Sequence, residues 1–301
     1  MKNKATLATL AALAGYSIFG FSFLFSKTAL NLATPFVLLA VRFLTAFLLL
    51  NILVLVGVIK LDLKGKPIKM LLLLGLVQPV LYFIFESYGI SMTTASFSGV
   101  MIGLVPVVGL VVDIVFMKER CTVLQAVCTV TSVIGVAMTT TGGFGTVSIP
   151  GFVLLLGAVV TAVLYAIISR KTAAMFSPFE RTYVMFALGS VAFSVMALVE
   201  TKGDLATLAV PLSEPVFWLC ILYLSVASSV CAFTAINFAV GYISAGRTMI
   251  FSNFTCVISA VAGMLILKET FTPLQLVGVV IIIASVFGVS FQSEPKEEKK
   301  Q

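Results

Sequence analysis

The chain contains no histidine, and none of its five cysteines forms a CxxC pair. Histidine is the commonest metal ligand and the usual general base, so its absence argues against a metal site and against most acid–base enzymes. The cysteines lie in or beside apolar runs, as expected of small apolar side chains rather than of a disulfide framework. They are Cys121, Cys128, Cys220, Cys231 and Cys256.

Motifs for catalysis and for nucleotide binding are missing as well. The sequence has no P-loop, no GxSxG, no HExxH and no paired acidic site. We therefore expect no metal, no cofactor and no enzymatic activity. We also expect that this chain does not drive transport with ATP by itself.

Charged residues are also rare: only 10% of the residues are charged, while 60% are hydrophobic. A soluble domain is about one quarter charged, so the bilayer must be the solvent for most of this surface. The net charge of +7 does not indicate nucleic-acid binding. The basic residues lie in short clusters between apolar runs, a pattern typical of the ends of membrane spans.

About 20 apolar residues are needed to cross the hydrocarbon core, and ten such segments occur in the sequence. We expect an all-α integral membrane protein with ten transmembrane helices and a disordered tail at 293–301. The first segment is too long for a cleaved signal peptide and is read as a span. The segments are 5–26, 34–58, 68–90, 95–117, 122–141, 149–170, 179–199, 216–240, 245–267 and 272–292.

Lysine and arginine placement predicts the orientation. With the N-terminus in the cytoplasm, fifteen of the nineteen basic residues lie inside, three lie outside, and Arg42 lies within a span. Cytoplasmic loops are enriched in these residues. We therefore expect a multi-pass protein of the cell (cytoplasmic) membrane with both termini in the cytoplasm.

An internal repeat divides the chain into halves at 1–141 and 149–292. Shifted by 150 residues, Lys118-Glu119 aligns with Lys268-Glu269, and Thr122 and Gln125 align with Thr272 and Gln275. Five helices in each half would give the second half the opposite orientation. This is an inverted repeat, an arrangement found in secondary transporters with a binding site between the halves.

Several residues follow a family pattern over nearly the whole length. They are Phe19-Gly20, Pro35, Arg42, Ala95, Pro106, Lys118-Glu119 and Gln125 in the first half, and Ser177-Pro178, Ala245, Glu269 and Gln275 in the second. In these the chain resembles the EamA branch of the drug/metabolite transporter (DMT) superfamily, although Cys128 and Cys256 replace the usual glycine and proline. The resemblance implies ten helices and small-molecule transport, with a cavity lined by helices one, three, four, six, eight and nine.

The third span carries a polar stripe, since Gln78, Tyr82 and Glu86 recur at i, i+4 and i+8. A charge in mid-membrane costs about 2.5–3.5 kcal/mol, so the stripe should face the interior of the bundle. We interpret Glu86 as a group that binds a proton or a substrate cation, with Tyr82 and Gln78 orienting it. The alternative is a hydrogen-bonded stripe that only joins helices.

Arg42 lies in the second span at a depth within reach of Glu86, so an ion pair between them is expected. That pair would be either a gate or a structural contact. Asp113 lies near the end of the fourth span, where it is expected to reach the interface.

In the second half, Ser225, Ser229, Phe233 and Asn237 form another i+4 stripe. Asn237, together with Tyr165 and Asn253, is a candidate cavity residue, although each is equally consistent with helix packing.

Three local features predict helix ends and contacts. Glu119 and Glu269 are expected to cap the fifth and tenth helices. Pro79 and Pro106 are expected to kink the third and fourth. Gly99 and Gly103 form a GxxxG step that allows close helix contact.

The favoured function is a secondary transporter that moves a small metabolite by alternating access, with export of an amino acid or related amphipathic solute as the first choice. Proton coupling through Glu86 is part of this hypothesis, and monomer and homodimer both stay open. An uptake carrier for quaternary-ammonium or other cationic solutes is the alternative, because a carboxylate among aromatics suits cations. A lipid-modifying membrane enzyme and a channel or structural subunit are the remaining hypotheses.

Overall fold

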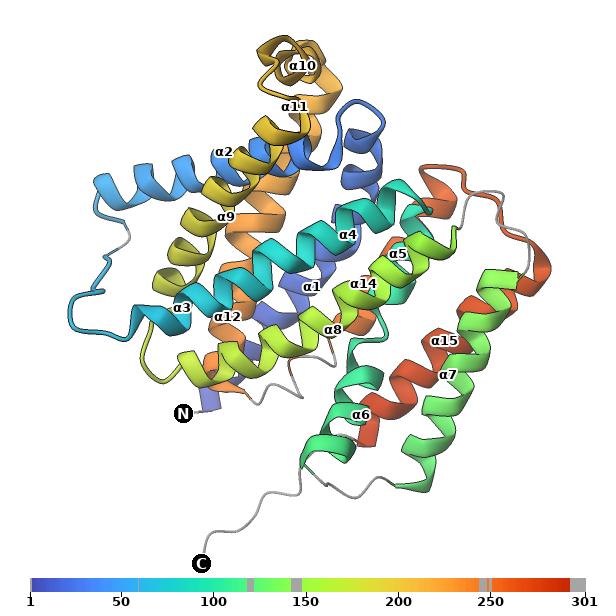
Figure 1. The fold of residues 1–301 in the computed structure, drawn as a ribbon. Helices are drawn as coiled ribbons and strands as arrows, with labels where there is room; N and C mark the ends of the chain where they lie inside the picture. The colour runs from blue at the N-terminus through green and yellow to red at the C-terminus, as the bar shows by residue number, and fades with distance from the viewer. Residues whose placement is uncertain are drawn as a thin grey trace, which may run out of the picture.

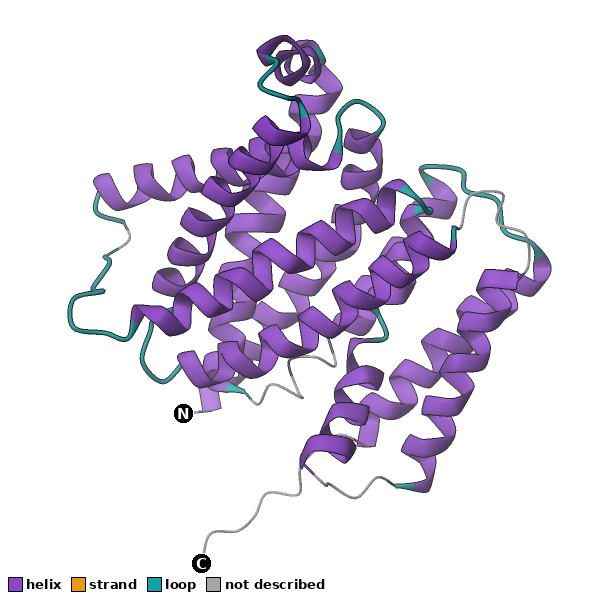
Figure 2. Cartoon of the chain, viewed as in Figure 1, coloured by secondary structure: helices purple, strands orange, loops and turns teal. Residues whose placement is uncertain are grey.

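The computed structural model describes residues 2–58, 60–117, 122–141, 148–243, 248 and 251–292, and every regular element in these ranges is helical (Figure 2). The predicted all-α class is therefore confirmed for the described chain. In the first half the elements are α1 (Lys2–Leu30), α2 (Pro35–Leu55), α3 (Ile68–Gly75), η1 (Leu76–Leu81), α4 (Tyr82–Ser91), α5 (Ala95–Ile102), α6 (Val105–Met117) and α7 (Val123–Thr141). In the second they are α8 (Ile149–Thr172), α9 (Pro178–Glu200), α10 (Leu205–Ala209), η2 (Val210–Ser213), α11 (Pro215–Leu222), η3 (Tyr223–Ala232), α12 (Phe233–Tyr242), α14 (Ser252–Leu265) and α15 (Pro273–Gln292).

Within the described ranges, seven helical segments are long and apolar enough to cross a membrane. They are Lys4–Leu30, Pro35–Leu55, Ile68–Ser91, Ala95–Val112, Ile149–Thr172, Pro178–Glu200 and Pro215–Tyr242. Three shorter apolar helices, at Val123–Thr139, Ser252–Leu265 and Pro273–Gly288, fall on three further predicted segments. The chain is thus a membrane protein with several spans, and the count of ten stays a prediction.

Helix α1 lies at the centre of the bundle, against α12, α14 and η3 (Figure 1). Around it, α2 packs on α9 and α4 packs on α8. Helices α7 and α15 pack mainly on each other and stand to one side, as Figure 1 shows. Both halves of the sequence therefore contribute helices to the packing around α1.

The predicted kink at Pro79 is present, and the helix is interrupted there. Gln78 has non-helical dihedral angles (φ −146°, ψ 119°), the Gln78–Pro79 bond is cis, and the surrounding turns of η1 are π-helical. Near Pro106 the chain breaks between α5 and α6 at Gly103, so Pro106 becomes the second residue of α6, a position where the missing N–H costs nothing. A π-helical stretch, η3, also lies between α11 and α12.

The predicted GxxxG contact is present between α5 and α14. A Cβ added at Gly99 would lie 1.8 Å from Ser259 Oγ and 2.2 Å from Ser259 Cβ, and one at Gly103 would lie 2.6 Å from Cys256 Cβ. The two glycines therefore let the helix axes approach closely, as small residues do in membranes.

We expect Gly99→Ala to lower the free energy of unfolding by about 1–3 kcal/mol, because the added methyl group overpacks a contact that has no space. Thermal unfolding in detergent measures the loss. The double variant Gly99→Ala/Ser259→Gly moves the small residue to the other helix and should recover most of it. Gly241→Ala is the control, since its Cβ would meet only Arg181 Nη2 at 3.9 Å. A loss as large in Gly241→Ala would contradict the role assigned to Gly99.

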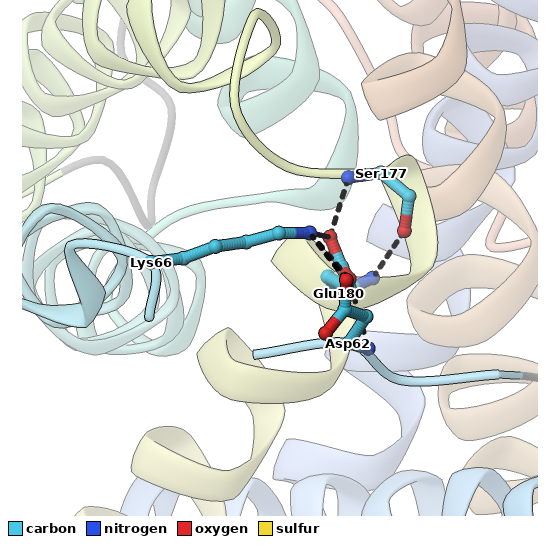
Figure 3. Close-up of polar contacts among 4 residues, drawn as sticks. All are labelled: Asp62, Lys66, Ser177 and Glu180. Carbon is cyan, nitrogen blue, oxygen red and sulfur yellow. Dashed lines mark hydrogen bonds and ion pairs between the residues drawn. The ribbon is translucent and has the colours of Figure 1, made fainter. Parts of the chain in front are cut away.

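The start of α9 fixes the loop between α2 and α3 (Figure 3). Ser177 and Glu180 form a reciprocal capping box, with the Ser177 N–H donating to Glu180 Oε2 at 2.7 Å. Glu180 Oε1 also accepts from Lys66 Nζ at 2.9 Å and from the Asp62 backbone N–H at 3.0 Å. One buried carboxylate thus both caps α9 and holds a lysine of the neighbouring loop.

The polar residues of the internal repeat are capping boxes. The Thr122 N–H donates to Gln125 Oε1 at 2.9 Å, and the Thr272 N–H donates to Gln275 Oε1 at 2.8 Å. Glu269 was expected to cap the tenth predicted helix, and this prediction was wrong. Its side chain accepts from the N–H groups of Ala95 and Ser96, at 2.8 and 3.0 Å. It therefore caps α5 of the other half, since Thr272 and Gln275 already occupy the start of α15.

Three of the sequence predictions lie outside the described residues, one of which is the disordered tail at 293–301. Glu119 belongs to 118–121, and the side chain of Asp113 is not described.

Candidate functional site

A central cavity lies between the two halves and encloses about 620 Å³ that atoms do not fill, of which about 40 Å³ admits the centre of a water molecule. The cavity is therefore narrow, with room for a few waters. Its walls come from α1, α2, η1, α4, α5, α6, α8, α12 and α14. The lining residues are Tyr16, Phe19, Ser22, Phe23, Arg42, Gln78, Tyr82, Phe83, Glu86, Ile102, Val105, Ala162, Tyr165, Phe233, Ile236, Ser252 and Thr255.

The predicted stripe Gln78, Tyr82 and Glu86 lies on this cavity. All three side chains are at least 90% buried, and Tyr82 Oη donates to Glu86 Oε1 at 3.0 Å. The structure brings the three together although the helix is interrupted at Gln78. Tyr82 thus orients one oxygen of Glu86, and no described residue donates a hydrogen bond to the other.

Two further polar atoms of cavity residues have no hydrogen-bond partner in the part of the chain that the structure describes. They are Gln78 Oε1 and Ser252 Oγ, from residues that are 5% and 1% exposed. A buried polar group without a partner costs about 1–3 kcal/mol. An acceptor and a hydroxyl left open on a cavity wall are suited to water or to a polar solute.

Arg42 lies on another wall of the cavity and is 1% exposed. Its Nε donates to Ser229 Oγ at 3.0 Å, and its Nη2 donates to Ser228 Oγ at 3.1 Å. The guanidinium carbon lies 4.3 Å from the centre of the Phe83 ring, a cation–π distance. Ser225 Oγ donates to the Arg42 carbonyl oxygen at 2.9 Å, so η3 holds both the side chain and the backbone of this residue.

The expected ion pair between Arg42 and Glu86 was wrong for this structure, because the two charged groups make no contact within 4.0 Å. Glu86 is bonded to Tyr82, and Arg42 is bonded to the two serines of η3. A buried cation and a buried anion therefore lie on one cavity without neutralising each other directly. Such an arrangement fits a ligand that carries both charges.

Aromatic rings make up much of the remaining wall. The Phe233 ring centre lies 5.2 Å from that of Phe19, 6.1 Å from Phe83 and 6.2 Å from Tyr165. Pairs at these distances form a rigid apolar surface. The cavity thus combines a few charged and polar groups with a large aromatic area, as small-molecule sites do.

The second-half candidates are divided. Tyr165 lines the cavity, whereas Asn237 and Asn253 do not. Asn237 is fully buried outside the cavity, where its Oδ1 accepts from Tyr165 Oη at 2.9 Å and its Nδ2 donates to Thr182 Oγ1 at 3.0 Å. Asn253 is buried in α14 next to the cavity residue Ser252.

Several cavity residues carry no clear mark in the sequence. Tyr16, Ser252 and Thr255 lie in apolar segments without a polar stripe, and they reach the cavity only because α1 and α14 pack together. Ser228 was missed because the predicted stripe includes Ser225 and Ser229, and the wider turns of η3 bring Ser228 to the same arginine.

Comparison with known proteins agrees with the membrane fold and with the expected family. The model of the EamA-like transporter family matches residues 6–141 and 149–291. An uncharacterized transporter of Bacillus subtilis, YcxC, is 33% identical over an alignment of 304 positions that covers 99% of this chain and 97% of that protein. An uncharacterized transporter of Archaeoglobus fulgidus is 21% identical and is matched over 95% of its length, with 91% of this chain covered.

One solved structure, described as the crystal structure of a protein, superposes with a TM-score of 0.65 and covers 94% of this chain and 96% of its own. At 14% identity this likeness concerns the fold alone. Two family matches that together span nearly the whole chain, and a relative that is one-third identical, agree on one assignment. The chain belongs to the EamA-like transporter family, within the drug/metabolite transporter superfamily.

Proposed function

We propose that the protein is a secondary transporter that carries a small amphipathic solute through the central cavity by alternating access. The observation that carries the proposal is the cavity itself, where Glu86 and Arg42 are buried without pairing to each other. Burying a charge is expensive unless a partner balances it. A solute that bonds to both groups would supply the missing partners.

A zwitterionic amino acid is the solute class that fits this arrangement best. Its ammonium group would bond to Glu86 and to the open acceptor Gln78 Oε1, and its carboxylate would bond to Arg42. The aromatic walls favour an apolar side chain over a charged one. A cationic solute without a carboxylate is the second candidate, because Glu86 lies among Tyr82, Phe83 and other rings and cations bind such faces.

Two equivalent contacts support an inverted repeat of two five-helix halves and ten spans. Lys27, near the end of α1, donates to the carbonyl oxygens of Ile90 and Thr93 at the end of α4. Arg170, near the end of α8, donates to those of Val240 and Ile243 at the end of α12. The acceptors are related by the same 150-residue shift as the sequence repeat.

The two contacts lie at opposite ends of α1. Ala8 and Ala12 pack near Ile243, whereas Lys27 reaches Ile90 from the other end of the helix. Opposite placement of equivalent contacts is what an inverted repeat requires. We propose that the N-terminal end of α1 faces the cytoplasm of the cell membrane, that flux is directed outward, and that Glu86 carries the coupling proton.

Counterflow in proteoliposomes tests the proposal. Vesicles loaded with an unlabelled solute should transiently accumulate the labelled solute, because a carrier exchanges one for the other. The panel is apolar amino acids, their decarboxylated amines, quaternary ammonium compounds and nucleosides. Trans-stimulation by amino acids alone supports the zwitterion class, and stimulation by amines favours the cationic alternative. Flux without trans-stimulation would indicate a channel and contradict the proposal.

A further inference from the structure

A second buried arginine lies outside the cavity, at the end of the bundle where α1 begins. Arg181 of α9 is 1% exposed. Its Nη1 donates to Ser169 Oγ at 2.9 Å and to the Ser169 carbonyl oxygen at 3.1 Å in α8, and its Nη2 donates to the Asn237 carbonyl oxygen in α12. One guanidinium thus joins three helices, and no carboxylate lies within 4.0 Å of it in the part of the chain described.

Asn237 extends these contacts to the cavity. Its Oδ1 accepts from Tyr165 Oη at 2.9 Å and from Ser169 Oγ at 3.1 Å, and its Nδ2 donates to Thr182 Oγ1 at 3.0 Å. Tyr165 is the member of this set that lines the cavity. We call Arg181, Asn237, Ser169, Thr182 and Tyr165 the Arg181 network.

The electrostatics of the network depend on how α8 and α12 are placed. Ser169 lies in the last turn of α8, where the carbonyl ends carry partial negative charge. Asn237 is the fifth residue of the ten-residue α12. With no carboxylate nearby, these carbonyl groups are what stabilises the buried charge. If the end of α12 moved away from α8 and α9, Arg181 would lose the carbonyl oxygen of Asn237, and the Asn237 side chain would lose its bonds to α8 and α9 at the same time.

The described residues of the first half contain no equivalent of this network. Counted from the proline that begins each helix, the place of Arg181 in α9 is taken in α2 by the buried Leu38. At the 150-residue shift, the place of Asn237 in α12 is taken in α4 by Ser87. The contacts of Lys27 and Arg170 are common to both halves, and the Arg181 network is added to them at one end. At the other end the carboxylate of Glu200 accepts from Tyr88 and Thr34, and so joins α9 to α4 and to the start of α2.

Helix α12 can bend at its start, because an irregular helical segment precedes it. It follows the π-helical η3, just as α4 follows the interrupted η1, and π-helical or broken turns are where helices bend. Both α4 and α12 contribute cavity residues, including Glu86 and Phe233. Each is therefore placed to open one end of the cavity.

We propose that Arg181 is a positioning residue that holds α12 closed at the end of the bundle where α1 begins, and that Tyr165 makes this closure respond to the solute. The proposal rests on the cavity being the transport path. A solute that takes the Tyr165 hydroxyl removes one of the hydrogen bonds of Asn237 and so favours opening. The Arg181 network is buried, whereas Glu200, which joins helices at the other end, is partly exposed to solvent, so the empty protein should rest with the Arg181 end closed.

Labelling of a cysteine in the cavity tests the proposal without any solute. The five native cysteines are replaced by alanine and Ala162, a cavity residue on α8, is changed to cysteine. A membrane-impermeant maleimide is applied to vesicles of either orientation, with an N-terminal tag marking the end at which α1 begins. Arg181→Met should raise the labelling rate from that end about tenfold, because the loss of one hydrogen bond to a charged group changes the ratio of open to closed protein by about that factor. The labelling rate from the other end should not rise.

Leu38→Met is the matched control at the equivalent position of the first half, and it should leave both rates unchanged. Thr182→Val is a milder variant that removes one acceptor of Asn237, and it should shift the ratio of the two rates in the same direction by about twofold. Rates that rise equally from both ends would indicate general loosening and would overturn the proposal, as would an unchanged ratio in both variants. These outcomes concern opening alone, so they are separate from the counterflow result.

Discussion

Glu86→Gln is expected to abolish solute accumulation driven by a proton gradient while leaving solute exchange intact. Glu86 is 4% exposed, and its hydrogen-bond donor in the protein is the Tyr82 hydroxyl. A buried carboxylate without a paired cation costs less when it binds a proton. Glutamine keeps the size and the acceptor for Tyr82, but it cannot bind or release a proton.

The measurement compares two rates in proteoliposomes, using an amino acid that is positive in counterflow. Gradient-driven initial uptake should fall at least about tenfold in Glu86→Gln, a barrier change of about 1.4 kcal/mol. Counterflow of the same solute should stay within about threefold of wild type, because exchange needs no net proton movement. Gradient-driven uptake at the wild-type rate would show that Glu86 does not carry the proton.

Glu200→Gln is the matched control for this variant. Glu200, at the end of α9, also accepts from a tyrosine hydroxyl, with Tyr88 Oη at 2.9 Å from its Oε1, but it does not line the cavity. The same substitution in a similar tyrosine–glutamate pair should leave both rates unchanged. If Glu200→Gln lowered uptake as much as Glu86→Gln, the loss would reflect helix packing rather than chemistry in the cavity.

The sequence was sufficient to predict the class of the protein and one wall of the cavity. Ionisable and amide groups are rare in this chain, so the spacing of Gln78, Tyr82 and Glu86 stands out, and burial cost alone predicts the direction in which they face. The family assignment followed from residues that set helix starts and close contacts. Gly20 and Pro35 are examples, since a close helix contact or a first helical turn restricts which residue can stand there.

The partners of these residues were not predictable from spacing. Arg42 and Ser229 are 187 positions apart, and their contact depends on how α2 packs against η3. The expected pair between Arg42 and Glu86 assumed that a buried charge binds the nearest opposite charge. Two serine hydroxyls and the Phe83 ring stabilise the guanidinium instead. For the same reason, the cap formed by Glu269 on α5 depends on tertiary structure that a local helix rule does not contain.

The eighth predicted span shows both what residue spacing can predict and what it cannot. Ser225, Ser229, Phe233 and Asn237 were expected to share one interior face, and all four are buried. The π-helical turns of η3 direct the serines to Arg42, whereas Phe233 lines the cavity and Asn237 joins the Arg181 network. Periodicity therefore predicted burial correctly, and the widened turns decided which group each residue meets.

Arg42→Met is expected to remove the preference for an amino acid over the amine that lacks its carboxylate. In the proposed complex Arg42 donates to the carboxylate, and a hydrogen bond to a charged group contributes about 1.5–3 kcal/mol. Wild type should therefore bind the amino acid about tenfold to a hundredfold more tightly than the amine. In Arg42→Met the two affinities should become similar, mainly through weaker binding of the amino acid.

Ligand-induced stabilisation of the purified protein measures both affinities, because a ligand that binds only the native state raises the melting temperature. Arg42→Lys keeps the charge but cannot reach Ser228 and Ser229 in the same geometry, so it should recover only part of the preference. Ser225→Ala is the control, since Ser225 bonds to the backbone carbonyl of Arg42 and not to its guanidinium. The ratio between the two ligands is informative even if every variant melts earlier, because general destabilisation affects both ligands equally. An unchanged ratio in Arg42→Met would mean that this arginine only joins α2 to η3, and that the ligand of Glu86 carries no carboxylate.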